Sequence, residues 1–141
     1  MKVPNTKWRI RRDSDWTTES AEDYFAGKRC LVVSLPGAFT PTCSGMQLPS
    51  LEALYDDFKG KGIDEVYCLS VNDSFVMNAW AKEHDIENVK MIPDGSGEFM
   101  RTGRSREIAP CMRPLVKASS SAPTASRVPG GSSCIVIILS A

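Results

Sequence analysis

Three short apolar runs that alternate with helical patterns constrain the fold of this chain more than any other feature. The runs are Cys30–Leu35, Val66–Val71 and Val89–Ile92. Runs of this length, rich in β-branched residues, are typical of buried strands. Because strands and helices alternate, the sequence predicts an α/β fold with a central parallel or mixed sheet flanked by helices.

The segments between these runs predict the helices. Four apolar residues follow the i, i+3, i+4, i+7 spacing of an amphipathic helix that ends near Gly60: Leu51, Leu54, Tyr55 and Phe58. A second helix is expected to begin at Asp73 or Ser74 and to run to about His84. The turn Pro93–Gly95 is expected to lead into the next helix.

The N-terminal residues predict smaller elements. Trp8–Arg12 is interpreted as an edge strand whose arginines face solvent. Ser20–Asp23 has the form of a capping box and predicts a short helical turn, which Gly27 ends.

Length and charge place the chain among ordinary globular domains. It has 141 residues and a formal net charge of zero, so nothing in its overall charge favours nucleic acid or an anionic membrane as a partner. It has no apolar run of the roughly 18–20 residues that a membrane-spanning helix needs, and Met1–Arg12 lacks the apolar segment of a secretory signal. We therefore expect a cytoplasmic location.

The cysteines favour redox chemistry over structural roles. There are five, at positions 30, 43, 68, 111 and 134, and no Cys-x-x-Cys pair is present. A disulfide framework is not expected in a reducing compartment. His84 is the only histidine, and paired ligand spacing is absent, so no metal site is predicted.

The C-terminal part differs in composition from the rest. Residues 1–100 carry 11 basic and 16 acidic residues, whereas residues 101–141 carry 6 and 1. Ser, Ala, Pro and Gly occupy 13 of the 17 positions from 117 to 133, which is typical of a linker or of disorder. We therefore divide the chain into a domain, 1–100, and an atypical tail, 101–141. Cys134–Leu139 is interpreted as a strand that no preceding element organises.

The segment Leu35–Ser44 connects the first buried strand to the amphipathic helix. Ligands of open α/β sheets bind at this end of the strands. Cys43 is expected at or just inside the start of the helix, where free backbone N–H groups stabilise an anion. Such a place favours the thiolate, which is the nucleophilic form of cysteine. The hydroxyl of Thr40 can reach the sulfur, and Pro36 and Pro41 stiffen the loop.

This segment resembles the active site of the peroxiredoxins. Pro36-x-x-x-Thr40-x-x-Cys43 matches their pattern, and the string Pro-Gly-Ala-Phe-Thr-Pro-Thr-Cys-Ser is similar to the peroxiredoxin-5 or type II subfamily. A second block, Tyr67–Trp80, and the string Asp94–Phe99 support the resemblance. It covers about Trp8 to Phe99 and implies a thioredoxin-like fold.

The resemblance also implies an activity and its residues. It implies reduction of hydrogen peroxide and organic hydroperoxides, with Cys43 as the peroxidatic cysteine that becomes a sulfenic acid. Thr40 would hydrogen-bond the thiolate and the peroxide, and Pro36 would shape and shield the pocket. No metal or organic cofactor is required. The implied reductants are glutathione, glutaredoxin or thioredoxin, and type II relatives often form homodimers.

Two routes for recycling Cys43 stay open. Cys68 lies 25 residues after Cys43 and matches the second cysteine of plant type II members, which suggests an intramolecular disulfide. A buried strand cysteine that only packs is the other interpretation, and an external thiol would then resolve the sulfenic acid. A disulfide requires Cα atoms within roughly 4.4–6.8 Å, so the start of the helix would have to unwind.

The resemblance ends in the tail. Family members carry an arginine that holds the thiolate, and it should fall near position 120, where this chain has Ser119–Ser121. We hypothesise a shifted coding frame after about residue 100, which would leave an edge of the sheet uncovered. The alternative function is therefore a catalytically impaired thioredoxin-like domain that acts at most as an interaction or redox-sensing module.

Overall fold

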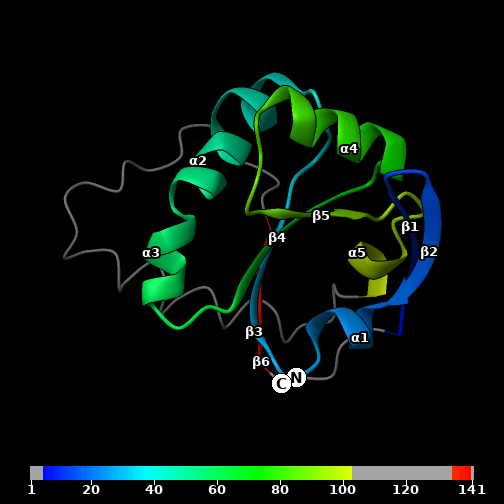
Figure 1. The fold of residues 1–141 in the computed structure, drawn as a ribbon, viewed down its shortest axis with the longest axis horizontal. Helices are drawn as coiled ribbons and strands as arrows, with labels where there is room; N and C mark the ends of the chain where they lie inside the picture. Colours follow the sequence, from blue (N-terminus) through cyan, green and yellow to red (C-terminus); the bar gives the residue numbers. More distant parts are fainter. Residues whose placement is uncertain (1–4, 103–134, 141) are drawn as a thin grey trace.

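A four-stranded sheet lies at the centre of the structure, a computed structural model that describes residues 5–102 and 135–140. The strand order is β5-β4-β3-β6. The central strands β3 (Arg29–Ser34) and β4 (Glu65–Ser70) pair in parallel, as do β4 and β5 (Lys90–Pro93). Strand β6 (Ile135–Ser140) runs antiparallel beside β3 (Figure 1). The three predicted strands and the mixed sheet are confirmed.

Helices connect the parallel strands. Between β3 and β4 lie the π-helical segment η1 (Cys43–Gln47), α2 (Leu48–Ala53) and α3 (Tyr55–Gly60). Helix α4 (Ser74–Glu83) connects β4 to β5, and the Asp73 side chain caps it by accepting a hydrogen bond from the backbone N–H of Val76 at 2.9 Å. Of the two caps that the sequence allows, Asp73 and Ser74, the structure has Asp73.

The sheet has a different core on each face, because successive side chains of a buried strand point to opposite sides. The core on one face, called here the hairpin-side core, includes the N-terminal hairpin residues Trp8 and Ile10 with Cys30 and Val32 of β3. The helix-side core on the other face has these members: Leu31, Val33, Leu35, Cys43, Leu48, Ile63, Val66, Cys68, Met77, Trp80 and Val89. Cys43 and Cys30 therefore belong to opposite faces.

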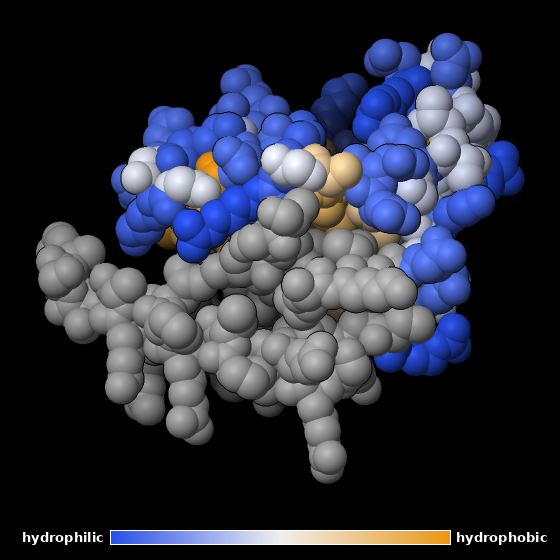
Figure 2. Space-filling model, turned by 90° about the horizontal axis from the view of Figure 1, so that it is seen from below, coloured by the Kyte–Doolittle hydropathy of each residue, from blue (hydrophilic) through white to orange (hydrophobic). Residues whose placement is uncertain are grey.

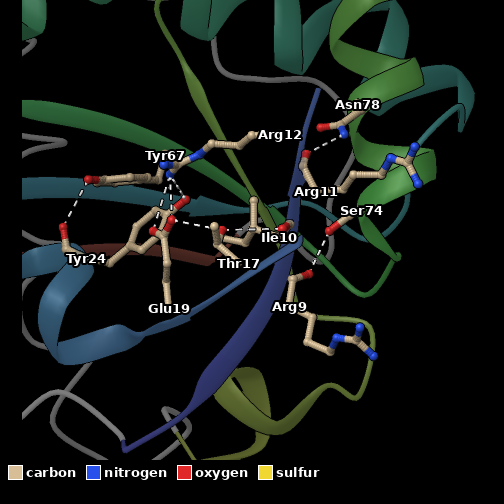
Figure 3. Close-up of polar contacts among 10 residues, drawn as sticks. All are labelled: Arg9, Ile10, Arg11, Arg12, Thr17, Glu19, Tyr24, Tyr67, Ser74 and Asn78. Carbon is tan, nitrogen blue, oxygen red and sulfur yellow. Dashed lines mark hydrogen bonds and ion pairs between the residues drawn. The ribbon is translucent and has the colours of Figure 1, made fainter. Parts of the chain in front are cut away.

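The N-terminal strand is one half of a hairpin. Strand β1 (Lys7–Arg12) pairs antiparallel with β2 (Asp15–Ser20), a strand that the sequence did not predict because its side chains are almost all exposed and polar. The hairpin is attached to α4 by two side-chain hydrogen bonds (Figure 3). Ser74 Oγ donates to the Arg9 carbonyl at 2.7 Å, and Asn78 Nδ2 donates to the Arg11 carbonyl at 2.9 Å.

Two short helices complete the hairpin-side face. Helix α1 (Ala21–Phe25) begins at Ser20, whose Oγ accepts from the Asp23 N–H at 3.1 Å, so the predicted capping interaction is present. Helix α5 (Glu98–Thr102) follows the predicted turn. The fully buried Asp94 carboxylate accepts from two of its N–H groups and from the Trp8 indole, and in this way joins the two ends of the described domain.

The amphipathic helix predicted over Leu51–Phe58 is interrupted, which corrects that prediction. Leu54 leaves helical geometry (φ −93°, ψ 4°) and separates α2 from α3, and its side chain is 44% exposed rather than buried. Leu51, Tyr55 and Phe58 do pack against the helix-side core. The apolar spacing located the helix but did not show the break.

The predicted C-terminal strand is present as β6, which pairs with all six residues of β3 and forms one outer strand of the described sheet. The predictions made for residues 103–134 lie outside the described residues. Among those described, no helix has the length and apolar character needed to cross a bilayer. Hydrophilic residues form most of the described surface that is visible in Figure 2.

Candidate active site

The segment that carries Cys43 leaves the sheet at the carboxyl end of β3. The Leu35 N–H still donates to the Leu69 carbonyl at 2.8 Å, and the chain then turns away at Pro36. The backbone becomes helical at Pro41 and takes π-helical form from Cys43 to Gln47, where the Leu48 N–H donates to the Cys43 carbonyl. Such π-helical turns are rare in proteins, and those that occur are often found at functional sites. The structure thus places Cys43 just inside the helix start, as predicted.

The loop before Cys43 is held by short-range hydrogen bonds. Thr40 Oγ1 donates to the Gly37 carbonyl at 2.9 Å, and the Ser44 N–H donates to the Thr40 carbonyl at 2.9 Å. Phe39 has a φ of 61°, in the left-handed region that bulky residues seldom adopt. Constrained backbone of this kind fixes the position of Thr40 relative to Cys43.

Burial differs sharply among the three predicted site residues. Pro36 and Thr40 are exposed, whereas Cys43 is only 3% exposed and is packed in the helix-side core. Thr40 already uses its one hydroxyl proton on Gly37, so as it stands its oxygen can only accept hydrogen bonds. To donate to the Cys43 sulfur, as the family resemblance implies, the hydroxyl would have to rotate.

Two side chains that follow β4 in the sequence make hydrogen bonds to this loop and to the Cys43 segment. Asn72 Oδ1 accepts from the Ala38 N–H at 3.0 Å and from Ser70 Oγ at 2.9 Å. Trp80 Nε1 donates to Ser44 Oγ at 2.9 Å. The sequence analysis included Asn72 and Trp80 in the matched block Tyr67–Trp80 but gave neither residue a role in the site. The sequence could have indicated them, because both follow β4, the parallel neighbour of the strand that leads into the Cys43 segment.

Cys68 lies inside β4. It is fully buried, aligns with Val33 of β3 and Met91 of β5, and shares the helix-side core with Cys43. Because β4 is hydrogen-bonded on both sides, any approach of the two sulfurs requires movement of Cys43. A resolving role for Cys68 stays a prediction.

The remaining described polar groups support no further reactive centre. Cys30 is buried, as expected of its strand, and the structure places it on the opposite face, where burial raises the pKa of its thiol to about 11. Within the described residues, no group of His, Cys, Asp or Glu side chains could hold a metal ion. His84 ends α4, as expected, and its ring lies against Trp80. Cys111 and Cys134 lie outside the described residues.

Comparison with known proteins agrees with this geometry. A peroxiredoxin of Rhizobium etli is 63% identical over 86 residues, which make up 61% of this chain and 48% of that protein. The hybrid peroxiredoxin hyPrx5 of Haemophilus influenzae is 47% identical over 98 residues, covering 70% of this chain and 41% of that one. The chain spans about half the length of the curated relatives it matches.

Solved structures give the same result at the level of the fold. The reduced Prx3 of Vibrio vulnificus in complex with H₂O₂ superimposes with a TM-score of 0.68 at 36% identity, covering 72% of this chain and 64% of that one. Peroxiredoxin 5 of Alvinella pompejana gives a TM-score of 0.60 at 33% identity over 70% of this chain and 63% of that one. The expected thioredoxin-like fold is confirmed. The family model described as Redoxin matches residues 1–105, and the chain therefore belongs to the redoxin family, among the peroxiredoxins.

Proposed function

We propose that this chain is a thiol peroxidase that reduces hydrogen peroxide and organic hydroperoxides at Cys43. The observation that carries the proposal is the position of Cys43. Its side chain is only 3% exposed and lies in the first turn of a helix. The constrained Pro36–Thr40 loop leads directly into that turn. Burial limits competing reactions of the sulfur with water.

The proposed reaction has two stages. The Cys43 thiolate attacks one peroxide oxygen, an S–O bond forms as the O–O bond breaks, and the other oxygen leaves as water or an alcohol after taking a proton. A thiol then attacks the sulfenic sulfur and releases water, which gives a disulfide that a second thiol reduces. The Thr40 hydroxyl oxygen would accept a hydrogen bond from the O–H of the peroxide, because its own proton is donated to the Gly37 carbonyl.

An external thiol is the reductant that we favour. Cys68 is held within β4 by strands on both sides, so an internal disulfide would require the Cys43 turn to unwind. Pro49 stands at the start of α2 and lacks the N–H that would strengthen this turn, which keeps the internal route open. Glutathione, glutaredoxin and thioredoxin are the thiols to test first.

Homodimer formation is a further part of the proposal. Four large apolar side chains near the carboxyl ends of β3 and β4 and on the hairpin are 44–55% exposed: Trp16, Phe39, Val71 and Phe75. The rings of Trp16 and Phe75 lie 5.5 Å apart, between centroids. Exposed apolar side chains that lie together are typical of interaction sites.

The alternative is a thioredoxin-like domain without useful catalysis. Its basis is the absence from the sequence near position 120 of the arginine that the resemblance implies. Loss of one such preorganised donor commonly lowers a rate by about 10²–10³. The alternative thus predicts a correctly folded chain with an unreactive Cys43.

One experiment separates the two functions. The wild-type chain and Cys43→Ser are mixed with a small excess of hydrogen peroxide, and oxidation is followed by stopped-flow and mass spectrometry. Rapid modification confined to position 43 supports the peroxidase, and a product joined to Cys68 would identify the internal route. Modification no faster than that of a free thiol supports the alternative.

A further inference from the structure

A buried indole lies against the segment that carries Cys43. Trp80 is on α4, is fully buried, and donates from Nε1 to Ser44 Oγ at 2.9 Å. Its ring also lies 6.5 Å, between centroids, from that of Phe39. Phe39 and Ser44 flank the Thr40–Cys43 turn, so one side chain of α4 contacts both sides of this turn (α4 is the green helix at the top of Figure 1).

The hydrogen bond from Trp80 to Ser44 restrains the turn that carries Cys43. Ser44 is the next residue after Cys43, and its own N–H is bonded to the Thr40 carbonyl. The two bonds together fix the turn, one from within the helix and one from α4. A buried N–H without an acceptor is unfavourable, so unwinding the turn costs the Trp80 bond and leaves this buried donor without an acceptor.

We propose that Trp80 is a positioning residue for Cys43: through Ser44 it holds the wound turn in which Cys43 meets peroxide. The inference rests on the proposed peroxidase function and deepens it. Recycling needs the opposite change, because a reductant or Cys68 reaches the buried Cys43 sulfur only when the turn loosens. Trp80 thus favours the wound conformation, which reacts with peroxide, over the loosened conformation, in which a thiol can reach the oxidised sulfur.

The variant Trp80→Phe removes the donor and keeps an aromatic ring. We expect oxidation of Cys43 by hydrogen peroxide to slow about three- to tenfold, as the loss of one hydrogen bond predicts. Reduction of the oxidised form by an external thiol should not slow. This split between the two half-reactions would not result from a general loss of stability.

Ser44 variants test the same bond from its other end. Ser44→Ala should reproduce the effect of Trp80→Phe, and the double variant should be no slower than either single one. Ser44→Thr keeps the hydroxyl and should restore most of the rate. These variants keep the proposal testable if Trp80→Phe does not fold.

Trp8→Phe is the matched control. Trp8 also donates a buried indole N–H, to Asp94 Oδ1 at 3.5 Å, but it belongs to the hairpin-side core on the other face of the sheet. Its loss should leave Cys43 oxidation at the wild-type rate. Wild-type oxidation in Trp80→Phe, additive losses in the double variant, or equal slowing in Trp8→Phe would each overturn the proposal.

Alkylation of Cys43 by iodoacetamide separates failure of this inference from failure of the proposed function. If the wild-type chain does not react rapidly with peroxide, the peroxidase proposal fails, but alkylation still reports how often the turn opens. We expect faster alkylation in Trp80→Phe and Ser44→Ala than in wild type at the same pH. Equal alkylation rates would show that Trp80 does not hold the turn.

Discussion

At the residue scale, the Thr40 hydroxyl is the polar group that the peroxiredoxin resemblance assigns beside Cys43. The structure shows its proton donated to Gly37 at 2.9 Å, which leaves the oxygen as an acceptor. The sequence pattern located Thr40 three positions before Cys43, but the direction of this hydrogen bond depends on how the loop folds back on itself.

Thr40→Val should slow the oxidation of Cys43 by about 10²-fold, because it removes one preorganised polar contact to the peroxide while keeping the side chain's shape. Stopped-flow mixing with hydrogen peroxide measures the rate. Thr40→Ser, which retains the hydroxyl, serves as the control and should stay within about tenfold of wild type. A Thr40→Val chain as fast as wild type would remove Thr40 from the mechanism.

At the element scale, α2 is attached to the segment before β5 by one carboxylate. Glu52 Oε1 accepts from the N–H groups of Glu87 and Asn88 and from Asn88 Nδ2, and Oε2 accepts from the Val89 N–H, at 2.8–3.2 Å. Desolvation disfavours the charged form, but these bonds outweigh it, and together they hold the pKa of Glu52 below its usual range. The helix that follows Cys43 is therefore anchored at its far end.

The hydrogen bonds of the Glu52 carboxylate, called here the Glu52 clamp, predict that the fold loses stability in acid. A carboxylate with a lowered pKa in the folded state contributes stability that is present above its ordinary pKa, near 4.3, and is lost as the pH falls through the folded value. The free energy of unfolding in urea, measured from pH 6 to pH 3, should therefore fall more steeply for wild type than for Glu52→Gln. Parallel curves for the two chains would contradict the role of the clamp.

Sequence reasoning succeeded for elements with strong local signals and failed for those without them. The buried strands and the caps at Ser20 and Asp73 were predicted correctly, because apolar runs and capping side chains act over a few residues. Strand β2 was missed because its stability comes from pairing with β1. The break at Leu54 was missed because the apolar spacing continues through it.

At the scale of the whole molecule, the sheet separates two sets of side chains with different roles. The helix-side core contains Cys43 and Cys68, whereas Cys30 lies among the aromatic rings of the hairpin-side core. Burial raises the pKa of Cys30 to about 11 and also raises that of the neighbouring Tyr67 phenol. Both groups keep their protons in the folded chain at a pH where the unfolded chain loses them.

The stability of the fold should therefore decrease at alkaline pH. Groups with a raised folded pKa contribute stability that is complete below the ordinary thiol pKa, about 8.5, and is lost as the pH rises toward 11. Urea unfolding at pH 7.5, 9 and 10.5 should show a falling free energy of unfolding. Cys30→Ala should be less stable at neutral pH, by about 1–3 kcal/mol, but should lose less on alkalinisation. An equal alkaline loss would show that Cys30 does not contribute.

The sequence by itself determined the family, the position of Cys43 at a helix start and the three buried strands, because these follow from contiguous strings and from local periodicity. Only the tertiary structure decided that Trp80, Asn72 and Glu52 support the helix of Cys43, since each acts on a segment more than 30 positions away. Likewise, only the fold placed β6 beside β3. Contacts at such separations arise from the packing of strands and helices, and no short pattern in the chain encodes them.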